Sequence, residues 1–367
     1  MNDPKKLLEN KIDNDNEKTL IDNTNSFDEI KLLKINPCLK FRENFNIANK
    51  AEKFNEIFEV YTSRKDGKEY LICPNYKTNR INIISINENK IEKELEGHEC
   101  HITSIRYFAN DKNNNEYLIS TDKSNLVIIW DISNNYQIYQ KIQTDYKDYI
   151  LSCLLIFNIE ISSSKVNNYV VISCSCIGFT KLYSFETNLF LKNIQNTENN
   201  LTNYLLLWKS KKDDNDYIIE CCYKKIFIYY LLNNNQLYAE LISNSTANSE
   251  HFGGVIYNKK DADLLLVSSS NGYIDVWDLF NKSIYLSINI NGSRYMDIIQ
   301  WNEKYTIVTD YVNKSINIID LTQMKVIGNI SGKGIVSVKK IKKINHPKYG
   351  QGILSSGYDN YLKLWTL

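Results

Sequence analysis

Four consecutive residues, His98-Glu99-Cys100-His101, form the densest group of metal-ligating side chains in the chain. Imidazole, thiolate and carboxylate groups all bind zinc, but a zinc site also requires further ligands at a defined spacing. No second cluster follows at such a spacing. The phosphate-cradling patterns Gly-x-x-x-x-Gly-Lys-Ser/Thr and Gly-x-Gly-x-x-Gly are missing as well. We therefore predict neither a metal ion nor a cofactor.

Other groups capable of chemistry are scattered along the chain. Cys174 and Cys176 would share one face of a strand, where free cysteines commonly pack as small apolar side chains. Asp275 and Asp297 are isolated carboxylates, for which we expect turn or surface roles. The nucleophile pattern Gly-x-Ser-x-Gly is absent. We predict that the protein is not an enzyme, and a cluster of shifted carboxylates in one place would argue against this prediction.

The composition describes a folded, electrically balanced protein. The 367 residues include 44 Lys and Arg against 43 Asp and Glu, so no global field attracts nucleic acid or an anionic membrane. Hydrophobic residues make up 43% of the chain, which is enough for a large core. Without a long apolar run or a signal peptide at the start, we expect an intracellular, cytoplasmic protein. Residues 1–35 are rich in Asn, Asp and Lys and are predicted to be a tail that is disordered or ordered by a partner.

Beyond the tail, short β-branched and aromatic runs alternate with polar clusters, and this texture is typical of an all-β protein. Grouping the runs in fours reveals a repeat whose third strand is the clearest. Its successive members lie 42 to 53 residues apart, close to the length of a four-stranded propeller blade. The aligned positions are Ile84, Trp130, Tyr183, Tyr229, Trp277, Ile319 and Trp365.

The second unit has Gly97-His98 before its first strand and Trp130-Asp131 at the end of its third, and Trp277-Asp278 repeats the latter pair. At these residues the chain resembles the WD-repeat (transducin beta-like) family of β-propellers, over residues 38–367. The resemblance implies an all-β, seven-bladed propeller over residues 36–367, without an internal domain boundary. The expected blades cover residues 54–97, 102–144, 150–196, 202–243, 251–291, 295–331 and 336–367.

The last unit ends after three strands, and its missing fourth strand has a candidate near the amino terminus. Leu39, Phe41, Phe45 and Ile47 share one parity, which is the period of a strand. In the family, an amino-terminal strand typically completes the last blade. We therefore expect the strand at residues 38–47 to close the ring and to cover sheet edges that would otherwise aggregate.

Blades of this family often contain a hydrogen-bonded tetrad of His, Ser or Thr, Asp and Trp. His98, Ser120 and Trp130 fit this pattern in the second unit, although Ser124 stands where Asp is expected and Asp122 lies two residues earlier. In the last unit the matching residues are Ser355, Asp359 and Trp365, without a preceding His. The resemblance implies a structural role for these residues.

In this family, partners usually bind the face built from two sets of loops, those before the first strands and those between the second and third strands. The candidate residues for a partner-binding face are Lys77, His101, Lys123, Tyr149, Arg294, Tyr295 and Tyr358. They mix aromatic rings with cations, as protein-binding surfaces do. The lysines between Lys339 and Lys343 are expected to be exposed on a strand and to keep its edge soluble.

The resemblance thus implies a non-catalytic scaffold that binds peptide segments or protein partners through its loops. We expect a monomer or a subunit of a hetero-complex, without nucleic acid or membrane as partners. The alternatives are a structural subunit of a large assembly, such as a cytoskeletal or ubiquitin-ligase complex, a phosphoinositide-binding propeller, or an enzyme. One fold hosts many functions, so the sequence does not identify the partner.

Overall fold

The computed structural model describes most of the chain from residue 57 onward, together with one short segment before it. The described residues are 34–35, 57–75, 77–88, 90–111, 113–144, 151–162, 165–174, 179–187, 189–195, 202–213, 215–222, 225–231, 236–242, 251–259, 261–270, 272–290, 295–331, 337–346, 350–357 and 362–366. All of their regular structure is β-strand, which confirms the predicted all-β class.

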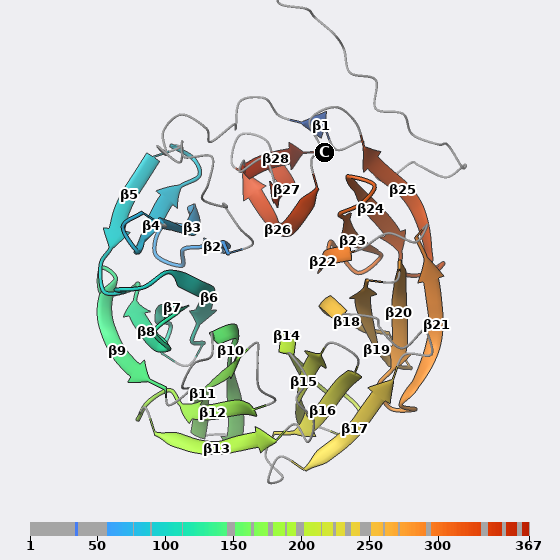
Figure 1. Ribbon diagram of the computed structural model, residues 1–367, viewed down its shortest axis with the longest axis horizontal. Helices are drawn as coiled ribbons and strands as arrows, with labels where there is room; N and C mark the ends of the chain where they lie inside the picture. The colour runs from blue at the N-terminus through green and yellow to red at the C-terminus, as the bar shows by residue number, and fades with distance from the viewer. Residues whose placement is uncertain are drawn as a thin grey trace, which may run out of the picture.

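The strands form seven sheets of four antiparallel strands, and these sheets are arranged as blades around a common centre (Figure 1). Blade 1 comprises β2 (Glu59–Thr62), β3 (Glu69–Asn75), β4 (Arg80–Ser85) and β5 (Lys90–Leu95). Blade 2 comprises β6 (Ile102–Ala109), β7 (Glu116–Asp122), β8 (Leu126–Asp131) and β9 (Gln137–Gln143). Blade 3 comprises β10 (Leu151–Ser162), β11 (Lys165–Cys174), β12 (Phe179–Ser184) and β13 (Phe190–Gln195).

The remaining blades repeat this order. Blade 4 comprises β14 (Thr202–Lys209), β15 (Asp216–Cys222), β16 (Lys225–Tyr230) and β17 (Leu237–Ile242). Blade 5 comprises β18 (His251–Asn258), β19 (Asp263–Ser269), β20 (Tyr273–Asp278) and β21 (Ser283–Asn289). Blade 6 comprises β22 (Tyr295–Gln300), β23 (Tyr305–Asp310), β24 (Ser315–Asp320) and β25 (Lys325–Ser331). Blade 7 comprises β26 (Val338–His346), β27 (Gly350–Gly357), β28 (Leu362–Thr366) and β1 (Lys34–Ile35).

The order of strands within each blade explains their burial. The first strands lie around the centre of the ring and the fourth strands lie at its rim (Figure 1). The second strand β7 is buried along its whole length, whereas the rim strand β5 alternates between exposed and partly buried residues. A strand covered on both faces reads as a continuous apolar run, and a strand with one solvated face alternates.

An amino-terminal strand closes the ring, as predicted, but not at the predicted position. β1 pairs antiparallel with β28 through Lys34 opposite Thr366 and Ile35 opposite Trp365. The predicted strand at residues 38–47, and the rest of the predicted tail, lie outside the described residues. A pairing of two residues has no periodicity that a single sequence could reveal.

The hydrophobic core is divided into seven clusters, one at each interface between neighbouring blades. The aligned third-strand residues Trp130 and Trp365 are each 1% exposed and belong to the interfaces between blades 1 and 2 and between blades 6 and 7. Burial of such apolar surface is the main stabilising contribution. The ring therefore holds its blades, and the loops that leave them, in fixed positions.

Candidate interaction face and the polar network beneath it

The loop that leads into β6 begins with a glycine because a tryptophan ring leaves no room for a side chain. A Cβ atom added at Gly97 would lie 2.9 Å from Cη2 of Trp130. This close approach lets the next residue, His98, turn inward, where it is 7% exposed. The Gly-His pair thus places an imidazole between the strands of blade 2.

His98 belongs to a continuous chain of hydrogen bonds. Its Nδ1 lies 2.7 Å from Oδ2 of Asp122, and its Nε2 lies 2.7 Å from Oγ of Ser120. The indole Nε1 of Trp130 donates to the same Ser120 oxygen at 2.9 Å. Because an ionised carboxylate only accepts, Nδ1 carries the proton of a neutral His98, and Ser120 donates its hydroxyl proton to Nε2. Every polar group in this buried chain is then satisfied.

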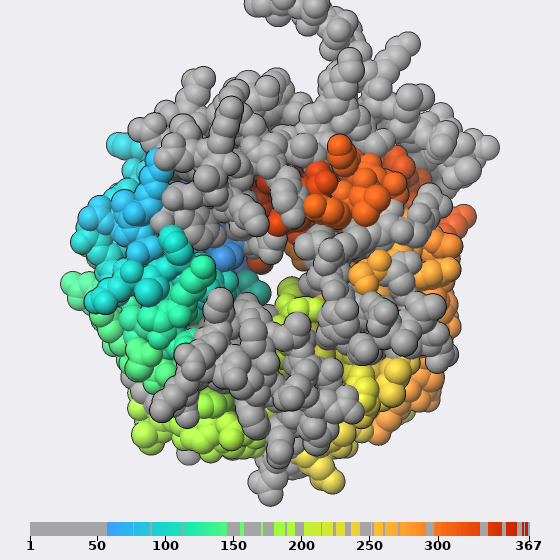
Figure 2. Space-filling model, viewed as in Figure 1, coloured from blue at the N-terminus to red at the C-terminus, as the bar shows by residue number. Residues whose placement is uncertain are grey.

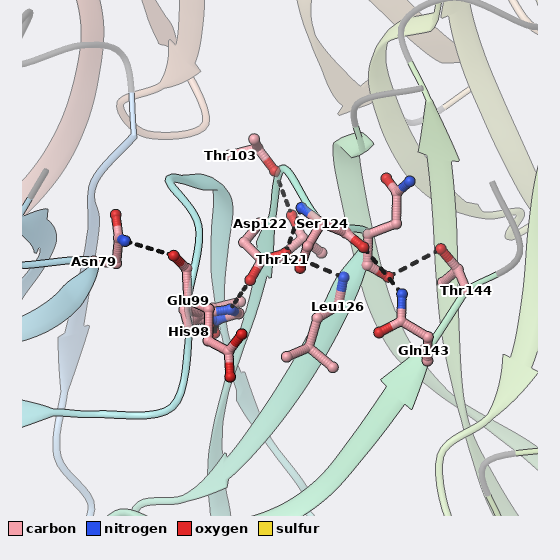
Figure 3. Close-up of polar contacts among 12 residues, drawn as sticks. Asn79, His98, Glu99, Thr103, Thr121, Asp122, Ser124, Leu126, Gln143 and Thr144 are labelled. Atoms are coloured by element: carbon pink, nitrogen blue, oxygen red, sulfur yellow. Dashed lines mark hydrogen bonds and ion pairs between the residues drawn. The ribbon is translucent and has the colours of Figure 1, made fainter. Parts of the chain in front are cut away.

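Asp122 is the acidic member of this tetrad, and Ser124, which occupies the position expected for it, is instead one of its donors. Oδ1 of Asp122 accepts hydrogen bonds from the backbone N–H and the hydroxyl of Ser124 and from the N–H of Leu126 (Figure 3). Burial by itself raises the pKa of Asp122, but the hydrogen bonds from His98 and Ser124 outweigh burial and lower it. The carboxylate therefore ties the turn after β7 to the loop before β6.

Within the described residues, blades 5 and 7 contain only parts of this network. In blade 7, Nε1 of Trp365 donates to Oγ of Ser355 at 2.7 Å, as the sequence predicted. The third predicted member, Asp359, lies outside the described residues. In blade 5 the register puts Val267 where Ser120 stands in blade 2, and Nε1 of the buried Trp277 has no hydrogen-bond partner in the described part of the chain.

Three loops next to the tetrad are joined by hydrogen bonds. The backbone N–H of Lys123 donates to the carbonyl of His101 at 3.0 Å. From blade 1, Nδ2 of Asn79 donates to the carbonyl of Glu99 at 2.7 Å (Figure 3). The turn between β7 and β8 and the turn between β3 and β4 are thus both bonded to the loop that leads into β6. Blades 1 and 2 together present one continuous polar surface on this side of the ring.

Three of the seven predicted face residues lie on this surface. Lys77, His101 and Lys123 are all exposed and come from the loops that these hydrogen bonds connect. Tyr295 begins β22, and only its backbone position is described. Tyr149, Arg294 and Tyr358 lie outside the described residues. Whether the seven residues form one binding face remains a prediction.

Residues 89–131 match a family model described as "WD domain, G-beta repeat". These residues are the rim strand β5 and the first three strands of blade 2, including the whole tetrad. Seven four-stranded sheets in a ring accompany this match. The chain is a WD-repeat propeller. No curated protein was found to match the sequence.

The centre of this WD-repeat propeller holds charged side chains that the sequence reasoning missed. Glu59, Arg106 and Lys342 occupy the same level of the inner strand in three consecutive blades. Oε1 of Glu59 lies 2.7 Å from Nζ of Lys342, and its Oε2 lies 4.0 Å from Nη1 of Arg106. Burial alone would raise the pKa of Glu59, but Lys342 and Arg106 lower it. The three residues are 47 residues or more apart in the chain, so only the ring closure brings them together.

Two expectations about charged residues were wrong. Asp275 and Asp297 are 1% and 8% exposed, so neither has a surface role. The lysines after Val338 lie on β26, an inner strand, where Lys339 is only 7% exposed, Lys340 and Lys342 are partly buried, and Lys343 alone of the four is exposed as expected. The hairpin was predicted correctly, but its first strand faces the centre of the ring. The repeat could have revealed this position, because it places β26 first in its blade and therefore next to the centre of the ring.

In the part of the chain that the structure describes, no helix could cross a membrane. Within the same residues, no three or more His, Cys, Asp or Glu side chains are grouped so as to hold a metal ion. His98 and His101 of the His-Glu-Cys-His run are separated accordingly, since His98 points into the tetrad and His101 is exposed.

Proposed function

We propose that this WD-repeat propeller is a non-catalytic interaction platform that binds peptide segments of protein partners on the loop face of blades 1 and 2. WD-repeat propellers are generally protein-interaction scaffolds, and the match over residues 89–131 supports that coarse function here. The finer assignment to this face rests on one observation. The exposed Lys77, His101 and Lys123 stand on loops fixed to one another by a backbone hydrogen bond and by a side-chain hydrogen bond from Asn79.

Fixed loops favour binding because little conformational entropy is lost when a partner docks. Two lysines on neighbouring blades favour an acidic or phosphorylated segment in an extended conformation. Rim charges of this kind chiefly accelerate association and are weakened by salt. The supporting argument for a platform without catalysis is that the carboxylates at the centre of the ring are already engaged: Glu59 by Lys342 and Asp297 by two backbone amides.

The test is a quantitative pulldown from cell extract with wild type and a charge-reversed Lys77→Glu/Lys123→Glu variant. The control is Lys90→Glu/Lys141→Glu, which makes the same change in charge on exposed residues of the rim strands β5 and β9 in the same two blades. Circular dichroism first establishes that all three proteins are folded. We expect at least one partner to be lost with the face variant and retained with the control.

A partner that is retained by both variants would show that the loop face of blades 1 and 2 is not the binding surface. A partner lost equally from both variants would indicate an effect of net charge alone. Either result would contradict the proposed face. Turnover of a substrate by the wild-type protein would contradict the absence of catalysis.

A further inference from the structure

Lys340 differs from the other cations at the centre of the ring. Arg106 donates to the carbonyl of Ile105 and lies near Glu59, and Lys342 forms an ion pair with Glu59. For the Lys340 ammonium, the described residues provide neither a hydrogen bond nor an ion pair. Lys340 is partly buried on the inner strand β26, and partial desolvation of an unpaired charge is costly.

The surroundings of Lys340 work against its charge. Burial and, to a smaller extent, the neighbouring cations Arg106 and Lys342 lower its pKa to about 7, although the carboxylates Asp297 and Glu59 raise it. Burial and the carboxylate of Asp297 also raise the pKa of Tyr204, which faces the same space from β14. Among the described residues, the groups that interact electrostatically with Lys340 are Arg106, Lys342, Asp297 and Glu59, and Tyr204 interacts with three of these four.

Both carboxylates already interact with other donors, and within the described residues neither one forms an ion pair with Lys340. Asp297 accepts the N–H of Ile298 on Oδ1 and the N–H of Ile341 on Oδ2, both at 3.0 Å. Glu59 directs one oxygen to Lys342 and the other toward Arg106. With Arg106 and two lysines against two carboxylates, the described charges leave an excess of one positive charge. The centre of the ring is open to solvent in the space-filling view (Figure 2).

We propose that the centre of the ring binds a phosphate group against Lys340, with Arg106 and Lys342 as the neighbouring cations. A phosphate supplies the acceptor oxygens that the Lys340 ammonium lacks. Its charge also offsets the repulsion among the three cations. The planar guanidinium of Arg106 can present two parallel donors to a phosphate, a geometry that a lysine cannot offer. The site is distinct from the loop face of blades 1 and 2, because its residues lie on inner strands.

The bound phosphate and the Lys340 proton are thermodynamically linked. An anion next to the ammonium favours its charged form, so binding raises the pKa of Lys340 above its value in the free protein. The affinity for a dianion should therefore be highest below pH 7 and fall as the pH rises above 7, until the pKa of the bound state is reached. The limiting slope is about tenfold per pH unit.

The first experiment is isothermal titration calorimetry of the full chain with inorganic phosphate at pH 7 and constant ionic strength. The variants are Lys340→Met, Lys340→Arg and, as a control exposed on the loop face, Lys77→Met. We expect saturable binding that weakens at least about tenfold in Lys340→Met and changes less than about twofold in Lys340→Arg and Lys77→Met. Thermal melts show whether each variant is folded.

The second experiment repeats the titration with sulfate between pH 6.5 and 8.5, since sulfate stays a dianion over this range. The affinity of the wild-type protein for sulfate should fall as the pH rises. The small affinity that Lys340→Met retains should not change with pH. A wild-type protein without saturable phosphate binding, or a Lys340→Met variant that binds like wild type, would overturn the proposal. Acetate binding as tightly as phosphate would overturn the assignment to phosphate.

A phosphoserine peptide, compared with its unphosphorylated form, identifies the source of the phosphate. Tighter binding of the phosphopeptide than of inorganic phosphate supports the site and assigns it to a phosphorylated protein. Binding of inorganic phosphate alone supports the site and assigns it to a free phosphate compound. The result of the pulldown with the loop-face variant does not affect phosphate binding at Lys340. Either proposal can therefore be refuted without the other.

Discussion

Two serines in equivalent positions allow the tetrad to be dissected. Ser120 in blade 2 bonds both Nε1 of Trp130 and Nε2 of His98, whereas Ser355 in blade 7 bonds, among the described residues, only Nε1 of Trp365. Both serines are 2% exposed or less. When either one is replaced by alanine, we expect that no water molecule takes over the hydrogen bonds of the lost hydroxyl group. A buried polar group without a partner costs roughly 1–3 kcal/mol.

Ser120→Ala leaves two such groups and Ser355→Ala leaves one. We therefore expect losses in the free energy of unfolding of roughly 2–6 kcal/mol for Ser120→Ala and roughly 1–3 kcal/mol for Ser355→Ala. Urea denaturation followed by tryptophan fluorescence and by circular dichroism measures both, and equal m values show that the two variants unfold alike. Equal losses in the two variants would refute the reasoning, because His98 would then contribute nothing through Ser120.

Further perturbations test other parts of the ring. Trp365→Ala should cost about 3–5 kcal/mol in urea denaturation, because its ring is buried between blades 6 and 7; a loss below about 1 kcal/mol would contradict this packing. Asp122→Asn should be less stable than wild type at pH 7. Since the pKa of Asp122 is lowered in the folded protein, this difference in unfolding free energy should shrink as the pH falls below about 4, and a difference that is constant in pH would contradict it. A protein that lacks residues 1–36 has lost β1, whereas one that lacks residues 1–33 retains it. The melting temperature of the shorter protein should be lower by an amount equivalent to roughly 1–3 kcal/mol. Identical melting curves of the two proteins would show that β1 does not close blade 7. Gly97→Ala should lower the melting temperature because its Cβ would collide with Trp130, whereas Gly67→Ala meets no atom within 4 Å and is strained only by its positive φ.

The fold could be predicted because it is periodic. Each blade needs a buried third strand at the same interface, so an apolar residue recurs at Ile84, Trp130 and their equivalents even where the surrounding pattern has changed. Seven weak signals in register define the ring more firmly than any single motif does. The count of strands in the last unit predicted that an amino-terminal strand closes the ring. It did not predict that this strand lies at Lys34–Ile35.

The errors share a physical cause, which is that they depend on side-chain contacts between segments distant in sequence. Asp122 ends β7 opposite the bulge in β6, so the bulge and not the residue count brings it to His98. Likewise, Glu59 and Lys342 meet only after the last blade has closed against the first. A single sequence shows neither event, because local spacing has no information about the closure of the ring.

Contacts between blades satisfy some of the buried polar groups that stand outside the tetrad of blade 2. In blade 4, Glu220 replaces the tetrad serine, and burial raises its pKa. Its Oε1 accepts hydrogen bonds from Thr202 within the blade and from Thr180 of blade 3. The short side chain of a serine would form hydrogen bonds within one blade, whereas Glu220 joins blades 3 and 4.

The residue that opens the second strand provides a similar connection at other interfaces. Glu69 of blade 1 accepts the backbone N–H of Asn345 from blade 7 at 2.8 Å, and Asp263 of blade 5 accepts the indole N–H of Trp208 from blade 4 at 2.9 Å. In blade 2, Glu116 accepts an N–H from blade 1 at 3.0 Å. All three carboxylates are buried, so each bond is shielded from water and an unpaired donor would be costly. These buried hydrogen bonds couple neighbouring blades in addition to the apolar contacts between them.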